Sequence, residues 1–153
     1  MATLEQIEIL MSGLGPVLDP LAIDASVEPR CWGIAMAEDL VVLVQFDERK
    51  NCLVLSCELG SPPAGDRTKL YETLLQMNYH WETTGGNRMA IDGPAGNVVQ
   101  LFEMGVHDID VSRLSRVIST FAGTAKAWRD YISRDSSSQS LPPAMSGNAG
   151  IKV

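Results

Sequence analysis

The side chains best suited to nucleophilic or metal chemistry are three cysteines and two histidines. Cys52 and Cys57 lie five residues apart in a segment that we expect to be one β-strand. Successive side chains of a strand point to opposite faces, so an odd spacing prevents both thiols from binding one ion. Cys31 lies in another expected strand, and the sequence contains no CxxC pair. We therefore expect no metal site.

The two histidines, His80 and His107, lie near the ends of expected elements and far apart in the sequence. No local signature joins either of them to a cysteine, as a Cys–His catalytic pair would require. Cysteine that takes no part in chemistry is commonly packed as a small apolar side chain. We therefore expect buried cysteines and surface histidines, and a cysteine-dependent enzyme is the weakest of the functions considered.

Other motifs that could carry chemistry are also weak. Gly85-Gly86 lacks the spacing of a phosphate-binding loop, and the flexible-loop interpretation is preferred. The acidic pairs Glu38-Asp39 and Asp47-Glu48 fall in expected turns, where carboxylates are solvated and not held in a cleft that shifts their pKa. The sequence therefore predicts a protein that is not an enzyme and that uses no cofactor.

Length and charge limit the classes of partner. A chain of 153 residues is most simply one domain. Its net charge of −7 argues against nucleic acid and against an anionic membrane as the main partner. The amino terminus shows no signal peptide, and the longest apolar run is too short to span a bilayer. With an odd number of cysteines, these features lead us to expect a reducing, cytoplasmic setting.

The first half of the sequence predicts one helix and three strands. Thr3 and Gln6 fit a capping box, and apolar residues then recur every three or four positions as far as Leu14. Gly15-Pro16 is expected to end this helix, because glycine suits the left-handed cap and proline cannot continue a helix. Residues 17–29 are expected to form an ordered loop. Strands are expected at residues 31–36, 40–46 and 52–59.

The second half predicts a helix, two strands and a long helix. Asp66 can cap a helix that runs to about Asn78, and Asp110 can cap the last helix. Gly123 lies inside this last helix at a cost of about 1 kcal/mol relative to alanine, so we expect close packing to require it. The two strands are expected at residues 89–91 and 98–104. The apolar stripe of the last helix comprises Val111, Leu114, Ile118, Phe121, Ala125, Trp128 and Ile132.

The composition changes after residue 133, where serine, proline and glycine dominate. Such a segment cannot form a core, so we expect residues 1–133 to form the domain and residues 134–153 a disordered tail. The expected order is helix-strand-strand-strand-helix-strand-strand-helix. Short strands joined by polar turns favour a twisted antiparallel sheet, and the expected fold class is α+β.

Apolar residues are more abundant in the central hairpin than one covered sheet face needs. Val42, Val44 and Phe46 share one face of a strand, and Val41 and Leu43 share the other. All of them could belong to the core of a monomer. However, three helices are few to cover a sheet that is apolar on both faces, and an uncovered face would bind another protein.

Several strings of the sequence, taken in order, resemble one known family. They extend over about residues 3–133, and each is a loose hydrophobic pattern, so the resemblance rests on their order. They are Leu18–Asp24, the strand pair Leu40–Leu59, the segment Leu59–Arg67 that leads into Leu70–Asn78, and Phe121–Arg129. In this order they resemble the class I chaperones of bacterial type III secretion, the Tir-chaperone or CesT-like family.

The resemblance implies a bacterial, cytoplasmic homodimer without enzymatic activity. Such a chaperone binds the amino-terminal segment of a secreted effector, keeps the effector soluble and competent for export, and leaves its release to the secretion ATPase. An alternative is a stand-alone interaction or regulatory domain of the same fold without a role in secretion. A disordered segment that orders on binding loses entropy, so either function requires a large apolar contact.

The resemblance also implies two sets of binding residues. The family's dimer interface lies on the second helix and the adjoining strand, and its effector grooves draw on the first helix and the sheet. The segment Gly85–Arg88 departs from the family pattern, which affects the expected dimer geometry. The matching dimer residues are Leu70, Leu74, Met77, Trp81 and Met89. The matching effector-binding residues are Leu14, Leu18, Ile34, Met36 and Val44.

Overall fold

The strands of the computed structural model form a six-stranded sheet in the order β1-β2-β3-β4-β6-β5, with antiparallel pairing at β1–β2, β2–β3, β3–β4 and β5–β6. The structure describes residues 1–20, 22–25, 28–63, 65, 67–94, 96–134 and 142–143. These fall into two compact units, Met1–Cys57 with Glu103–Ala122, and Glu58–Phe102 with Gly123–Val153, which are described separately. The predicted α+β class and antiparallel sheet are confirmed.

The first unit begins with α1 (Leu4–Ser12), and the predicted capping box is present. The Gln6 N–H donates to Thr3 Oγ1 at 3.3 Å, and the Thr3 N–H donates to Gln6 Oε1 at 2.9 Å. Both hydrogen bonds satisfy amide groups that the first turn of a helix leaves without partners. The sequence therefore fixes the start of this helix locally.

The predicted end of this helix is wrong. α1 stops at Ser12 with Gly13 as its cap, and Gly15–Leu18 forms a second short helix, α2. Pro16 lies in the first turn of α2, where the missing N–H of proline costs nothing because that group has no partner inside the helix. A Cβ on Gly13 would lie 2.9 Å from Cγ2 of Val111, so the turn passes too close to the last helix for a larger residue.

Residues 17–29 contain a strand that the sequence did not predict. β1 (Ala22–Ala25) pairs antiparallel with β2 (Cys31–Ala35), and Ile23 lies opposite Ile34. Four residues that include Asp24 carry a weak strand signal, because aspartate is depleted in strands. The pairing partner supplied by β2, rather than local propensity, therefore determines this strand.

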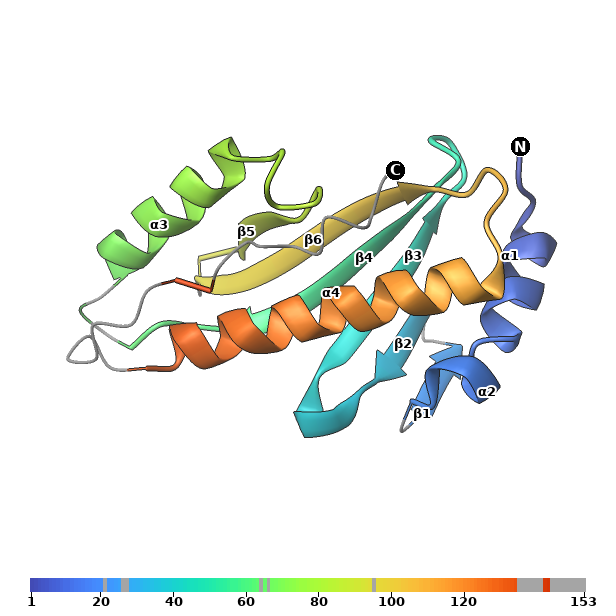
Figure 1. The fold of residues 1–153 in the computed structure, drawn as a ribbon, viewed down its shortest axis with the longest axis horizontal. Coiled ribbons are helices and arrows are strands. Elements are labelled where there is room, and N and C mark those ends of the chain that lie inside the picture. The colour runs from blue at the N-terminus through green and yellow to red at the C-terminus, as the bar shows by residue number, and fades with distance from the viewer. Residues whose placement is uncertain are drawn as a thin grey trace. The chain divides into compact units, whose positions relative to one another are not determined.

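The three predicted strands are confirmed as β2, β3 (Val41–Asp47) and β4 (Cys52–Gly60), and Figure 1 shows β1, β2 and β3 side by side. The predicted turn at Glu38-Asp39 is confirmed within η1 (Ala37–Asp39): both residues have left-handed φ angles, 61° and 59°, and the Met36 N–H donates to the Leu40 carbonyl at 2.7 Å across the turn. The turn after β3 ends at Asn51, which has a φ of 52°. Its Oδ1 accepts from the Ala2 N–H at 2.9 Å and its carbonyl accepts from the Val106 N–H at 3.3 Å.

One face of the first unit's sheet is buried. Alternate residues of β2, β3 and β4 face this core, and the register places them opposite one another in rows, such as Trp32 with Val44 and Val44 with Leu55. Buried residues of the first part of α4 belong to the same unit. The buried residues on this face of β2, β3 and β4 are Trp32, Ile34, Val42, Val44, Phe46, Leu53, Leu55 and Cys57.

The second unit contains α3 (Arg67–Tyr79), β5 (Arg88–Asp92) and the first part of β6 (Asn97–Gly105). The side chain of Asn78 joins α3 to β5: it accepts from the Met89 N–H and donates to the Met89 carbonyl, both at 2.8 Å. Tyr71 donates its hydroxyl to the Gly96 carbonyl at 3.3 Å. The predicted cap of α3, Asp66, lies outside the described residues.

The last helix, α4 (Val111–Ile132), matches its prediction closely. The Arg113 N–H donates to Asp110 Oδ1 at 2.7 Å, which confirms the predicted cap. The predicted stripe is buried except at Val111, which is half-buried. The expectation for Gly123 is wrong, because this residue is exposed and a Cβ there would meet no described atom within 4 Å.

Among the described residues, no helix is long and apolar enough to cross a membrane. The expected disorder of residues 134–153 falls almost entirely on residues that lie outside the described part of the chain. Arg134, Pro142 and Pro143 are described there, and both prolines are half-buried.

Candidate binding surfaces

Two of the three cysteines are buried and both histidines are exposed, as the sequence predicts, but Cys31 is not buried. Cys52 and Cys57 are 7% and 2% exposed and face opposite sides of β4, whereas Cys31 is half-buried. His107 is highly exposed, and its Nε2 atom lies 3.1 Å from Oδ2 of Asp108. His80 is also exposed. No group of three or more His, Cys, Asp or Glu residues that could hold a metal ion occurs in the described part of the chain.

Two of the thiols are held in their neutral form. Burial raises the pKa of Cys31, and the nearby Glu28 carboxylate raises it further. Burial also raises the pKa of Cys52, with added repulsion from Glu103 and Asp47 that Lys50 partly offsets. Because the thiolate is the reactive species, neither residue is set up as a nucleophile.

We therefore expect slow alkylation of Cys31 and Cys52 by iodoacetamide in the native protein at neutral pH. Cys52 should react more slowly than Cys31, because it is also less exposed. Both rates should continue to increase with pH beyond the range in which an ordinary thiol titrates, because the pKa of each thiol is raised. Unfolding in urea should remove the difference between the two rates. Peptide mass spectrometry of a labelling time course measures each rate. Rapid labelling of Cys52 at neutral pH would contradict this assignment.

On β2 and β3, the second face of the first unit's sheet is partly open to solvent. Val41 and Leu43 of β3 are 47% and 43% exposed, and β2 presents only small side chains beside them. Gly33 lies opposite Leu43, and a Cβ at Gly33 would be in ordinary van der Waals contact with Leu43 Cδ2 at 3.8 Å, so the side chains of β2 on this face are smaller than those of β3. We name this the open sheet face, defined by Cys31, Gly33, Ala35, Val41 and Leu43.

A hollow of about 700 Å³ borders the open sheet face. Gln45 and Val54 line it, and both lie in the same cross-strand row as Cys31. Its rim carries charges of both signs, including an ion pair between Arg30 and Glu48 at 2.9 Å. The hollow can therefore accommodate polar side chains of a segment that lies on the open sheet face.

β1 forms one edge of the sheet. Among the strands that the structure describes it has a neighbour only on the β2 side, so its other backbone edge can exchange hydrogen bonds with an added strand. This edge and the open sheet face belong to the same unit.

The five predicted effector-binding residues divide into two groups. Leu14, Ile34 and Val44 are fully buried, at 0% exposure. Leu18 and Met36 are half-buried. In the single chain only the second group is accessible to a partner. The sequence did not assign Val41 and Leu43 to the groove, although their alternation with buried residues was the signal for a second apolar face.

The second unit carries an exposed apolar surface on and beside α3, which we name the α3–β5 surface. Leu75 and Tyr79 are 68% and 81% exposed and lie one turn apart on α3. Of the predicted dimer residues, Trp81 is 68% exposed and Met77 is half-buried, whereas Leu70, Leu74 and Met89 are buried. The sequence did not identify Leu75, Tyr79 and Ile91 as exposed. Under this name we group the exposed large apolar residues of α3, of β5 and of the segment between them, which are Leu75, Tyr79, Trp81 and Ile91.

These features define a small α+β protein whose described surface offers apolar binding faces. Its family follows from the sequence: the model of the Tir chaperone protein (CesT) family matches residues 28–129. The chain belongs to the CesT family, and the resemblance found in the sequence is confirmed. Family and fold are those of a chaperone. No curated protein sequence matches the chain.

Solved structures of low sequence identity share the fold. A crystal structure of the ExsC–ExsE complex matches with a TM-score of 0.73 and 13% identity over 89% of this chain and 100% of the other. The HopA1–SchA chaperone–effector complex matches with a TM-score of 0.65 and 14% identity, over 81% of this chain and 93% of the other. The ExoU–SpcU complex of the type III secretion system of Pseudomonas aeruginosa matches with a TM-score of 0.58 and 21% identity, over 82% of this chain and 97% of the other.

Proposed function

We propose that this protein is a type III secretion chaperone that binds the amino-terminal segment of a secreted effector and keeps the effector soluble and competent for export. The observation that carries this proposal is the match to the CesT family over residues 28–129. Structural similarity to a chaperone–effector complex supports it. We expect the protein to act in the bacterial cytoplasm, where effectors are held before export, and to hand its cargo to the secretion ATPase.

The open sheet face provides a physical basis for binding an extended segment. One part of the segment would lie across the sheet and bury Val41 and Leu43, and another part would pair its backbone with the outer edge of β1. Apolar burial contributes about 25 cal/mol per Å², so a long contact is needed to offset the entropy lost when a disordered segment becomes ordered. The charged rim of the adjoining hollow would select polar side chains at fixed positions along the segment.

The five effector-binding residues predicted from the sequence take different roles in this proposal. We assign Leu18 and Met36 to direct contact, because both remain partly accessible. Ile34 and Val44 lie on the covered face of the same strands and would support the open sheet face from behind. Leu14 is likewise part of the core of the first unit.

We also propose that the protein is a homodimer joined through the α3–β5 surface. Leu75, Tyr79 and Trp81 expose large apolar side chains that a second copy could cover. Leu70, Leu74 and Met89 would hold α3 and β5 in place beneath this interface, and Met77 would lie at its border.

Leu75→Ala should weaken this dimer about a hundredfold, because a two-fold interface loses the side chain from both copies and each buried leucine contributes about 1.5 kcal/mol or more. Sedimentation equilibrium over a range of concentrations measures the change. Gln76→Ala on the same helix serves as the matched control, since Gln76 is exposed and polar. A parent protein that stays monomeric at high micromolar concentration would rule out the dimer but not effector binding.

The experiment that tests the proposed function is a pull-down from the native host, with mass spectrometry of the captured protein. We expect one protein whose isolated amino-terminal segment binds the chain and whose secretion falls when the chain is deleted. Capture of a partner whose secretion is unaffected, or of a protein that is not secreted, would favour the alternative, an interaction domain outside secretion.

A further inference from the structure

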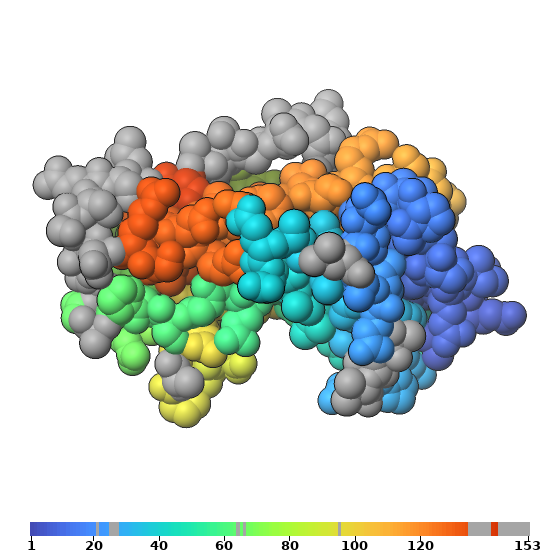
Figure 2. All heavy atoms as spheres, turned by 90° about the horizontal axis from the view of Figure 1, so that it is seen from below, coloured from blue at the N-terminus to red at the C-terminus, as the bar shows by residue number. Residues whose placement is uncertain are grey.

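We propose that the carboxyl-terminal half of α4 carries a proline-binding surface, and that the chain's own Pro142-Pro143 pair occupies it. Pro143 lines a hollow of about 360 Å³ on this part of the helix. In Figure 2 the red atoms of residues 142–143 lie against the orange-red atoms of α4. The other residues that line the hollow are Gly123, Lys126, Ala127, Asp130, Tyr131 and Arg134. This inference does not depend on the proposed chaperone function.

The shape of the hollow follows from helix geometry. Gly123, Ala127 and Tyr131 are spaced by four residues, so the three positions form one row along the helix. Two of them are small, and the position that a Cβ of Gly123 would take is more than 4 Å from any described neighbour. The row is therefore low at one end and is closed by an aromatic ring at the other.

The ring of Tyr131 is held in a fixed orientation. It packs edge-on against Trp128 with a centroid distance of 5.5 Å and an angle of 82° between the rings. Trp128 is fully buried, at 0% exposure, so it anchors the half-buried tyrosine. Proline-rich segments bind to aromatic surfaces because their preformed extended conformation loses little entropy on docking.

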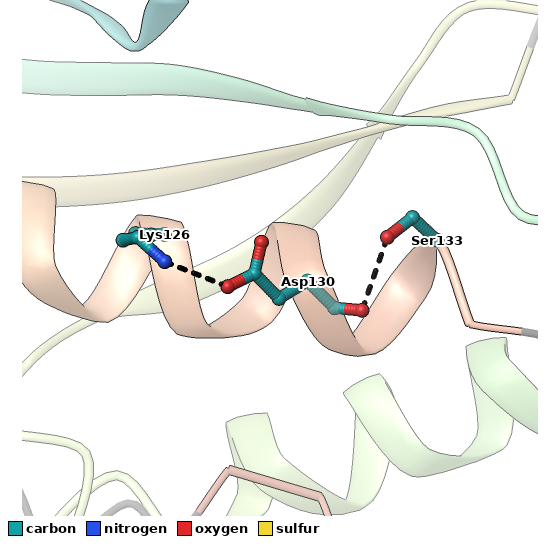
Figure 3. A network of polar contacts seen from close by, with 3 residues as sticks. All are labelled: Lys126, Asp130 and Ser133. Atoms are coloured by element: carbon teal, nitrogen blue, oxygen red, sulfur yellow. Dashed lines mark hydrogen bonds and ion pairs between the residues drawn. The ribbon is translucent and has the colours of Figure 1, made fainter. Parts of the chain in front are cut away.

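Two of the charged residues beside this row, Lys126 and Asp130, pair with each other within the helix. Lys126 Nζ donates to Asp130 Oδ2 at 2.9 Å, and the Ser133 hydroxyl donates to the Asp130 carbonyl at 3.1 Å (Figure 3). The hydrogen bond from Lys126 holds the pKa of Asp130 below its ordinary value, so the pair stays ionised at neutral pH. These contacts leave the surface suited to proline, which has no N–H to donate.

The chain is long enough for the prolines to return to their own helix. α4 rises by about 16 Å from Gly123 to Arg134. The ~8 residue steps from Arg134 to Pro142 can span at most about 28 Å. The local concentration of a tethered segment is high, so even a weak contact of two prolines with their own chain can be well populated.

Nitration of Tyr131 by tetranitromethane tests this inference in the full chain. The double variant Pro142→Ser/Pro143→Ser should raise the nitration rate of Tyr131 relative to that of Tyr79 about threefold, as expected if the surface is covered most of the time. Tyr79 is 81% exposed and serves as the internal reference. Pro94→Ser, an exposed turn proline, is the control and should leave the ratio unchanged.

A second variant separates docking of the prolines from a general effect of filling the hollow. Gly123→Leu fills only the empty space that Pro143 borders, so Tyr131 should stay protected while both prolines remain. Unchanged thermal melting would show that both variants are folded. An unchanged Tyr131 ratio in the double proline variant would overturn the proposal, as would an equal rise of the ratio in both variants. Protection of Tyr131 that grows with protein concentration would also overturn it, by assigning the prolines to a second copy.

Discussion

Leu43→Asp should weaken effector binding roughly a hundredfold, a loss of about 3 kcal/mol, because an unpaired carboxylate would be buried under the bound segment. Leu43 is 43% exposed in the centre of the open sheet face and lies opposite Gly33 and Ser56. The folded protein itself should tolerate the change, since the carboxylate remains in contact with water. Titration calorimetry with the amino-terminal segment of the captured effector measures the difference.

Ile9→Asp is the matched control for this prediction. Ile9 is 66% exposed on α1 in the same unit, so the same substitution adds the same charge away from the sheet. We expect little change in affinity for this variant. If Ile9→Asp abolished binding while Leu43→Asp did not, the segment would bind α1, and the open sheet face would not be its site.

Asn78→Leu should lower the free energy of unfolding by about 2–3 kcal/mol, because it leaves both backbone groups of Met89 without their hydrogen bonds. The amide of Asn78 makes two 2.8 Å contacts with Met89 and thereby joins α3 to β5. Leucine has the same heavy-atom branching as asparagine but neither donates nor accepts a hydrogen bond. The midpoint of urea unfolding, compared at one protein concentration, measures the loss.

Gln76→Leu provides the control for Asn78→Leu. Gln76 is exposed on the same helix, so the substitution changes the same functional group without removing a contact to β5. We expect an effect within about 0.5 kcal/mol. A similarly small effect for Asn78→Leu would mean that water replaces the amide and that packing alone joins α3 to β5.

Local signals predicted the elements whose ends are fixed by nearby groups. The capping box of Thr3 and Gln6 and the cap at Asp110 each require only residues three positions away, so both could be found from the sequence. The end of α1 was missed because Gly15-Pro16 fits a helix start as well as a helix stop. β1 was missed because its hydrogen bonds go to β2, which the local sequence does not encode.

The candidate surfaces show the same division. Alternation along β3 predicted two apolar faces, but the choice of the covered one depends on which helices pack there. On α3, Leu70 and Leu74 look no different in sequence from Leu75, yet the first two are buried and the third is exposed. Gly123 was expected to be packed, and only the surrounding structure shows that it borders a hollow.

For this protein the sequence alone determined the α+β class, the antiparallel sheet and the chaperone family, because these depend on periodicity and on the order of apolar segments. Only the tertiary structure decided that Ile34 and Val44 are covered, that Val41 and Leu43 are open, and that Leu75 and Tyr79 form an exposed row. The physical reason is that burial depends on which distant elements pack on each face, and a residue's own type and spacing do not specify those neighbours.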